Sequence, residues 1–220
     1  MLSSGSQRSS EIWADLSLLQ QKLSKKVKIE PLSREVRLIG GCDCGIRKDK
    51  GIGVITVVEL PGLREIEWSY WVGTIALPYR SGYLGFREVP LLVGAYRKLK
   101  NRPDLFLIDG QGIAHPRRIG LASHFGVVID QPTIGCAKSK LIGDYREPPS
   151  TRGSYAPLLD GSELLGYVVR TKDNVRCLFA SPGHRTDFPD ALFWILHLTT
   201  GYRVPQPIRF AHHHAKEIQV

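Results

Sequence analysis

The sequence predicts a mixed α/β protein in which one sheet, with antiparallel and then parallel strands, is flanked by helices. Two observations carry this prediction. Three β-rich segments follow one another closely between residues 36 and 75, and helical segments then alternate with short apolar runs. Strands joined by short turns pair antiparallel, whereas a strand reached through a helix usually pairs parallel to its neighbour.

The bulk properties indicate a basic globular protein, whose charge suits a polyanion although membrane-surface proteins share it. A chain of 220 residues is expected to form a single domain over residues 1–220. Residues 1–10 are polar, so we expect them to be flexible, and they lack the apolar core of a signal peptide. No apolar run is long enough to span a membrane, and the four cysteines suit buried thiols in a reducing, cytoplasmic setting. A net charge of +9 favours nucleic acid.

The first half of the chain should contain a helix, three strands and a second helix. Apolar spacing predicts a helix over residues 10–27 that covers one face of the sheet. Strands are expected over residues 36–45, 51–60 and 65–75, as an antiparallel meander. A loop follows at residues 78–83. The next helix is predicted from about residue 86 to 101, with Pro90 in its first turn.

The second half should alternate strands and helices. Strands are predicted at 105–109 and 127–130, around a short helix at 117–126, and a surface loop at 144–157. A hairpin is expected at 164–171 and 176–180, followed by a turn at 181–184 and helices at 187–200 and 208–216. This order of elements is typical of a ribonuclease H-like sheet.

Acidic residues are the first candidates for chemistry. In a ribonuclease H-like sheet, Asp43 on the first strand and Asp109 at the end of the fourth would meet, and an unpaired buried aspartate is costly. Asp43 could instead cap a neighbouring turn. Glu88 near a helix start could join the pair, although a carboxylate there stabilises a helix anyway. An oxygen-rich set suits Mg²⁺ or Mn²⁺ and phosphodiester hydrolysis.

Basic residues could complete this site. His212 could act as a ligand or as a base that orients water, and Lys138 could neutralise charge on a phosphate. The alternatives are an ordinary solvated lysine and a surface run of histidines at 212–214, which cannot all face one site. No G-x-S-x-G, Walker-type or Rossmann glycine motif is present, which argues against those chemistries.

The stretch 105–120 (LFLIDGQGIAHPRRIG) is predicted to contribute to a ligand site. It delivers a carboxylate, two glycines and His115 into a basic loop. Tyr79, in the loop 78–83, could stack on or wedge between bases, or could pack at the sheet edge.

With these residues in view, the chain resembles the endonuclease V family over roughly residues 39–212. The specific stretches are IDGQGIAHPR (108–117), PTIGCAKS (132–139), GYLGFRE (82–88) and SPGH (181–184). The resemblance implies a Mg²⁺-dependent repair nuclease, with Mn²⁺ as a substitute, that recognises deoxyinosine in DNA. We expect the protein to be a monomer. It would cut the second phosphodiester 3′ to the lesion, leaving 3′-hydroxyl and 5′-phosphate ends. Inosine-containing RNA is left open as a target.

The resemblance also implies roles for particular residues. The acidic catalytic set is Asp43, Glu88 and Asp109, with the two aspartates as direct metal ligands and Glu88 acting through water. His212 is the late histidine and Lys138 contacts phosphate. The base pocket would be formed by backbone around Leu84, Gly110 and Leu121, with His115 nearby and Tyr79 in the strand-separating loop.

This chain departs from the family at that loop. The usual Pro-Tyr-Ile-Pro reads Pro78-Tyr79-Arg80-Ser81 here, so the second proline that would stiffen the loop is missing. The departure puts the balance between duplex and single-stranded substrates in question. Two other functions remain open at this point: a structure-specific nuclease of the same fold, and a catalytically silent DNA-binding module.

Overall fold

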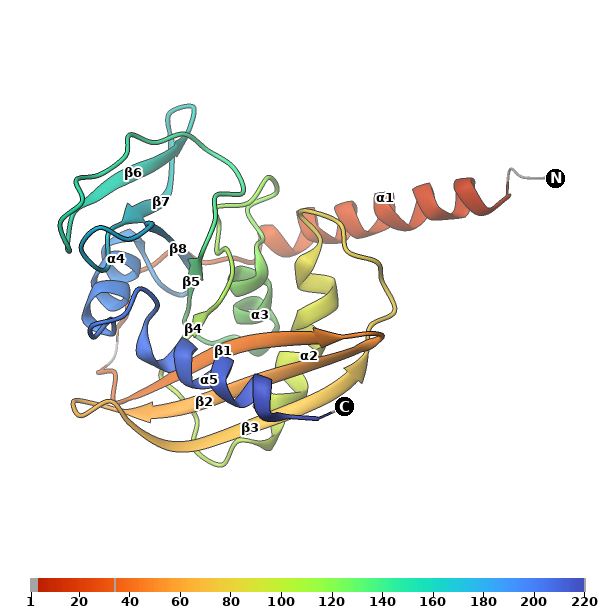
Figure 1. Ribbon diagram of the computed structural model, residues 1–220. Helices are drawn as coiled ribbons and strands as arrows, with labels where there is room; N and C mark the ends of the chain where they lie inside the picture. The colour runs from red at the N-terminus through yellow and green to blue at the C-terminus, as the bar shows by residue number, and fades with distance from the viewer. Residues whose placement is uncertain (1–3, 34, 220) are drawn as a thin grey trace.

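The computed structural model describes residues 4–33 and 35–219. In this part of the chain the strands form one eight-stranded sheet in the order β3-β2-β1-β4-β5-β8-β7-β6 (Figure 1). The strands are β1 (Leu38–Arg47), β2 (Lys50–Glu59), β3 (Arg64–Thr74), β4 (Leu105–Ile108), β5 (Thr133–Ala137), β6 (Tyr155–Asp160), β7 (Glu163–Val169) and β8 (Leu178–His184).

The pairing of the strands confirms the predicted mixed sheet. β1, β2 and β3 form an antiparallel meander, in which Asp43 lies opposite Val54. β4 pairs parallel to β1, with Ile108 opposite Cys42, and β5 pairs parallel to β4. The remaining strands return antiparallel through β8, β7 and β6. The parallel trio β1-β4-β5 therefore lies in the middle of the sheet.

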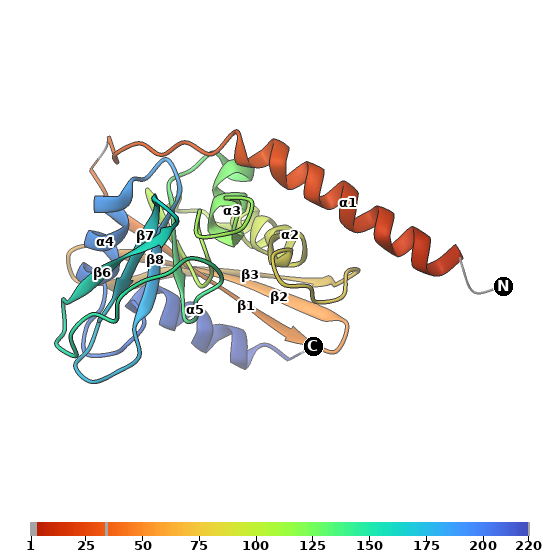
Figure 2. The same ribbon diagram turned by 90° about the horizontal axis from the view of Figure 1, so that it is seen from above.

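Helices cover both faces of the sheet (Figure 2). On one face α2 (Leu84–Lys98) and α3 (Leu121–Ile129) pack on a core that includes Cys42, Phe106 and Ile108. On the other face α4 (Phe188–His197) and α5 (Gln206–Glu217) pack near the middle of the sheet. Because side chains alternate along a strand, neighbours such as Cys42 and Asp43 point into different layers.

The first helix differs from the prediction. α1 (Ser4–Ser24) projects from the body and contacts α3 and the loop at 78–83, rather than covering a face of the sheet (Figures 1 and 2). It begins within the segment expected to be flexible, and residues 1–3 of that segment lie outside the described residues. Ile12 and Leu19, on its apolar stripe, stay exposed because little of the body faces them.

Four local predictions were wrong. The surface loop predicted at 144–157 gives way to β6 from Tyr155 onward. α2 begins at Leu84, so Pro90 lies in its second turn. Residues 127–129 continue α3, whose Ala122 and Phe125 are buried, instead of forming a strand. The expected turn at 181–184 is the end of β8, buried against β5.

The cysteines are free thiols, as expected, and the described helices agree with the expected lack of a membrane span. All four cysteines are free, and Cys42, Cys136 and Cys177 are buried while Cys44 is partly exposed. Within residues 4–33 and 35–219, none of the helices combines the length and the hydropathy needed to cross a bilayer.

Candidate active site and adjoining cavity

Two aspartates meet where the parallel pairing of β1 with β4 ends. Asp43 lies on β1, and Asp109 directly follows β4. The backbone N–H of Asp109 donates to the carbonyl of Cys42 at 3.1 Å, which fixes the two aspartates on adjacent strands. Both side chains are largely buried, with exposed fractions of 10% for Asp43 and 14% for Asp109. The predicted pair of carboxylates is therefore brought together.

Glu88 approaches the pair from the helical layer on the other face. It lies on α2, it is buried, and its carboxyl group hydrogen-bonds with the thiol of Cys44. Burial raises the pKa of Glu88 to about 8, with further contributions from the charges of Asp43 and Asp109. Three carboxyl groups thus share one partly desolvated region.

Basic side chains partner the two aspartates. His212 on α5 shares a hydrogen bond with Asp43, with Nδ1 and Oδ2 2.7 Å apart. Burial and the charge of Asp109 raise the pKa of Asp43, and the bond to His212 opposes that rise. Lys138, just after β5, forms an ion pair with Asp109. Burial disfavours the charged form of Lys138, but this ion pair outweighs burial and raises its pKa.

The three consecutive histidines of α5 separate as the sequence predicts. His212 reaches Asp43, whereas the exposed His213 pairs with Glu217 at 3.2 Å. His214 bonds to Glu65 and stacks on the exposed Trp68 of β3, with ring centroids 4.2 Å apart. Only His212 of the three therefore belongs to the carboxylate cluster.

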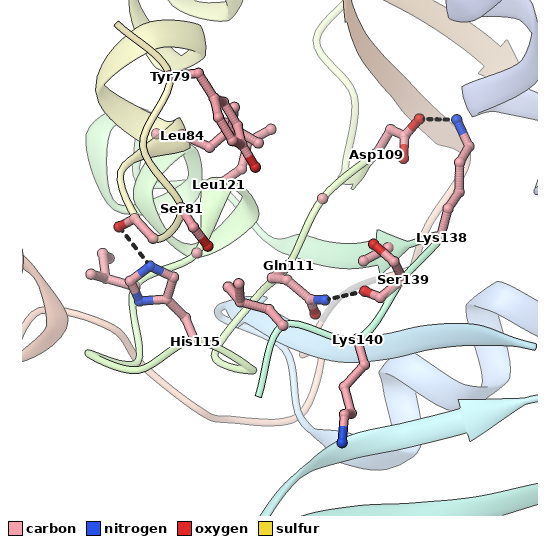
Figure 3. Close-up of a pocket in the computed structure, with 17 residues that line it drawn as sticks. Tyr79, Ser81, Leu84, Asp109, Gln111, His115, Leu121, Lys138, Ser139 and Lys140 are labelled. Carbon is pink, nitrogen blue, oxygen red and sulfur yellow. Dashed lines mark hydrogen bonds and ion pairs between the residues drawn. The ribbon is translucent and has the colours of Figure 1, made fainter. Parts of the chain in front are cut away.

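A cavity of roughly 380 Å³ opens beside this cluster (Figure 3). Its size lies in the usual range for small-ligand sites. All five residues predicted for the base pocket line it, namely Tyr79, Leu84, Gly110, His115 and Leu121. Asp109 and Lys138 line it as well, whereas Asp43, Glu88 and His212 are not among its lining residues. Asp109 and Lys138 therefore connect the cavity with the carboxylate cluster.

Backbone segments pack in close contact next to the cavity wall. A Cβ on Gly112 would lie 2.0 Å from the carbonyl oxygen of Pro182, and one on Gly120 would lie 2.3 Å from that of Gln111. The N–H of Gly112 already donates to Ser181 Oγ at 2.8 Å. The glycines thus let three chain segments meet without intervening side chains.

His115 supports the rim of the cavity. It is buried, and its Nδ1 accepts the N–H of Arg117 at 3.1 Å, so the other ring nitrogen, Nε2, carries the proton and donates to the carbonyl of Gly82 at 2.9 Å. Burial lowers the pKa of His115 to about 4, so the ring is neutral near pH 7. Tyr79, on the same rim, is 71% exposed, with the guanidinium of Arg87 5.7 Å from its ring.

Several lining residues were not predicted from the sequence. Gln111 is buried in the wall, and its Nε2 donates to the carbonyl of Ser139 at 2.9 Å (Figure 3). Its Oε1 has no hydrogen-bond partner among the described residues. Ser139 and Lys140 also line the cavity. Two features of the sequence could have indicated these residues. Ser139 and Lys140 directly follow Lys138, and Gln111 lies between two glycines.

Within the described part of the chain, no group of three histidine, cysteine, aspartate or glutamate side chains is arranged to hold a metal ion. The aspartates are engaged by Lys138 and His212 instead. The donor chemistry nevertheless fits a hard divalent cation, because three carboxyl groups with mutually unfavourable charges lie together.

A ribonuclease H-like sheet with one carboxylate within β1 and another directly after β4, beside a cavity carrying a lysine, defines a nuclease. The chain belongs to the endonuclease V family, because the family model described as Endonuclease V matches residues 21–213.

Relatives and solved structures agree with this assignment. Endonuclease V of Dictyoglomus turgidum is 44% identical over 200 residues, which cover 91% of this chain and 88% of the relative. The crystal structure of endonuclease V from Streptomyces avermitilis superposes with a TM-score of 0.88 at 36% identity, covering 93% of this chain and 91% of that one. A variant of Ciona intestinalis endonuclease V has been solved in complex with a 23mer DNA containing an inosine followed by a ribo-adenosine. It superposes with a TM-score of 0.83 at 26% identity, covering 94% of this chain and 96% of that one.

Proposed function

We propose that this chain recognises deoxyinosine in DNA and hydrolyses the second phosphodiester bond 3′ to it, in a Mg²⁺-dependent reaction that leaves 3′-hydroxyl and 5′-phosphate ends. The observation that carries the proposal is the junction at Asp109 and Lys138, where the cavity adjoins the carboxylate cluster. A ligand in the cavity would hold its connected phosphates close to the carboxylates.

Asp43 and Asp109 would hold the metal directly, and Glu88 would contribute through water. When bound, Mg²⁺ would supply positive charge at the reacting phosphate and would make water a better nucleophile; Mn²⁺ would substitute for it. Lys138 would release Asp109 to the metal and offer its charge to the phosphate. His212 would hold Asp43 in place through Nδ1 and would orient water through its other ring nitrogen, Nε2.

The cavity would take the flipped hypoxanthine. Hypoxanthine differs from adenine by a carbonyl at position 6 and a proton on N1, so backbone donors and acceptors can distinguish the two bases. The walls around Leu84, Gly110 and Leu121 would supply these groups. Tyr79, exposed on the rim, would occupy the space that the flipped base leaves in the stack.

The test is nicking of matched strands that carry inosine or adenine at one position, as single- and double-stranded DNA and RNA, with Mg²⁺ and then Ca²⁺. We expect Mg²⁺-dependent cutting of the inosine strand alone, at the second bond on its 3′ side. Equal cutting of an inosine-free junction would favour a structure-specific nuclease of the same fold. Binding without cutting under every condition would favour a silent binding module.

Asp109→Asn is the matching variant, since it keeps the volume of the side chain and removes the charge. We expect it to abolish cutting while leaving binding to the inosine strand mostly intact. Asp49→Asn, in the exposed turn between β1 and β2, is the control and should cut normally. Normal cutting by Asp109→Asn would exclude the mechanism.

A further inference from the structure

The projecting helix α1 makes specific contacts with the cavity rim. Three of its side chains, Trp13, Ser17 and Gln20, lie four and three residues apart and therefore on one face of the helix. All three contact the rim loop, residues 78–83, or the residues that hold it. They also precede residue 21, where the match to the family model begins.

The first group of contacts surrounds Tyr83. Its ring meets that of Trp13 edge to face at 4.9 Å, and its hydroxyl shares a hydrogen bond with Ser17. The guanidinium of Arg80 lies 4.8 Å from the centroid of Trp13 and 5.4 Å from that of Tyr83. Arg117 lies 4.5 Å from the Tyr83 ring. Two cations and one indole thus surround a buried tyrosine at the end of the rim loop.

The second group converges on one carbonyl oxygen. Gly82, with a φ of 80°, presents its carbonyl to three donors: Gln20 Nε2 at 2.9 Å, His115 Nε2 at 2.9 Å and Arg117 Nη2 at 3.0 Å. Arg117 also donates through Nε to the side-chain oxygen of Gln20. A left-handed glycine held by three donors fixes the backbone of the loop directly after Ser81.

We propose that α1 is a brace that positions the rim loop for substrate, and that Arg80 and Trp13 form its essential contact. This inference rests on the proposed function, because the loop is the side of the cavity that would meet the strand. Pro78 is the one proline of the rim loop, and it lies at the start of the loop. The cation–π contact between Arg80 and α1 constrains the residues that follow it.

Steady-state cutting of inosine strands by Trp13→Ala and Arg80→Ala tests the brace. We expect KM to rise about fivefold in each variant with kcat little changed, the size expected for one lost cation–π contact. The double variant should be no worse than either single variant, because both remove the same contact. Trp13→Phe keeps an aromatic face and should recover most of the affinity.

The matched control is Leu18→Ala, which truncates an exposed side chain on the same helix and should leave KM unchanged. Thermal unfolding of every variant separates the brace from a general loss of stability. Equal KM values for Trp13→Ala and Leu18→Ala would overturn the proposal. A loss of kcat of equal size in Trp13→Ala and Trp13→Phe would also overturn the proposal, because positioning of the rim loop predicts an effect on KM.

A second measurement needs no substrate. Trypsin cleaves after arginine, and the Arg80–Ser81 bond lies in the braced loop, so cleavage there should be several times faster in Trp13→Ala than in the wild type or in Leu18→Ala. Unchanged cleavage at this bond would also overturn the brace. If the wild-type chain cut no inosine strand, the proposed function would fail, and proteolysis would still decide whether α1 holds the loop.

Discussion

Gly135 of β5 lies directly against Gly112, the residue after Gln111 of the cavity wall: a Cβ on Gly135 would be 2.2 Å from the backbone nitrogen of Gly112. Two segments of the chain therefore touch through their backbones next to the cavity wall. Because the contact leaves no room for even a methyl group, these two glycines fix the position of the segment that carries Gln111 relative to the sheet.

Gly135→Ala should destabilise the fold by about 2 kcal/mol or more, because overpacking a tight interior forces the backbone to move. The same movement should weaken binding of inosine strands. Gly62→Ala is the control, since a Cβ there would meet nothing within 4 Å. Urea unfolding and strand binding check both effects, and a Gly135→Ala protein as stable as Gly62→Ala would contradict the close contact.

Lys138→Met should reduce kcat on inosine strands by roughly 100-fold, since a positioned charge that stabilises a transition state typically contributes that much. The variant keeps most of the side-chain volume and removes the partner of Asp109. Lys140→Met, also on the cavity wall, is the comparison and should affect KM more than kcat. Identical kcat values for the two variants would count against a role for Lys138 at the phosphate.

His212→Gln should lower kcat by about 100-fold or more, as expected for loss of a group that orients water or transfers a proton. The neighbouring His213 offers a control on the same helix, because it is exposed and pairs only with Glu217 among the described residues. His213→Gln should cut normally. A comparable loss of activity in both variants would indicate damage to α5 rather than a site at His212.

Tyr79→Ala should weaken binding to inosine strands by roughly 1–3 kcal/mol, the usual contribution of an aromatic side chain that stacks on a base. Its stability should be unchanged, because the side chain is 71% exposed. Tyr202→Ala removes another exposed tyrosine, which lies against Arg209 away from the cavity, and should bind normally. Fluorescence anisotropy with labelled strands measures the difference, and equal affinities would exclude stacking by Tyr79.

His124 should make stability depend on pH. Burial lowers its pKa to about 4 in the folded protein, below its ordinary value near 6.5. Between these values the unfolded chain binds the proton more readily, so this contribution to stability is lost as pH falls from about 6.5 to 4. The loss is up to roughly 1.4 kcal/mol per pH unit.

The variant His124→Gln isolates this effect from other titrating groups. Its unfolding free energy, subtracted from that of the wild type, should change across pH 6.5 to 4. A difference for His124→Gln that did not vary with pH would show that burial leaves this histidine titrating normally.

The sheet could be predicted because its signals are local. The meander follows from short turns between β-rich runs, and the parallel pairing of β1 with β4 follows from the helix between β3 and β4. The meeting of Asp43 and Asp109 follows from that pairing. The strand expected at residues 127–130 failed because burial of Phe125 against the sheet extends α3 through two valines.

Contacts between residues far apart in the sequence could not be predicted. The convergence of Gln20, His115 and Arg117 on the carbonyl of Gly82 depends on the left-handed φ of one glycine and on the path of α1. Neither leaves a periodic signal in the sequence. The wall contact between Gln111 and Ser139 has the same origin, since it joins the ends of two adjacent strands.

The bond between Asp43 and His212 joins residues 169 positions apart, on the first strand and the last helix. During synthesis, Asp43, Glu88 and Asp109 emerge from the ribosome well before α5 exists. A nascent chain would therefore carry every acidic residue of the cluster without the histidine that partners Asp43. Cutting activity should therefore arise only after α5 has been synthesised and has docked, so translation products that stop before α5 should not cut.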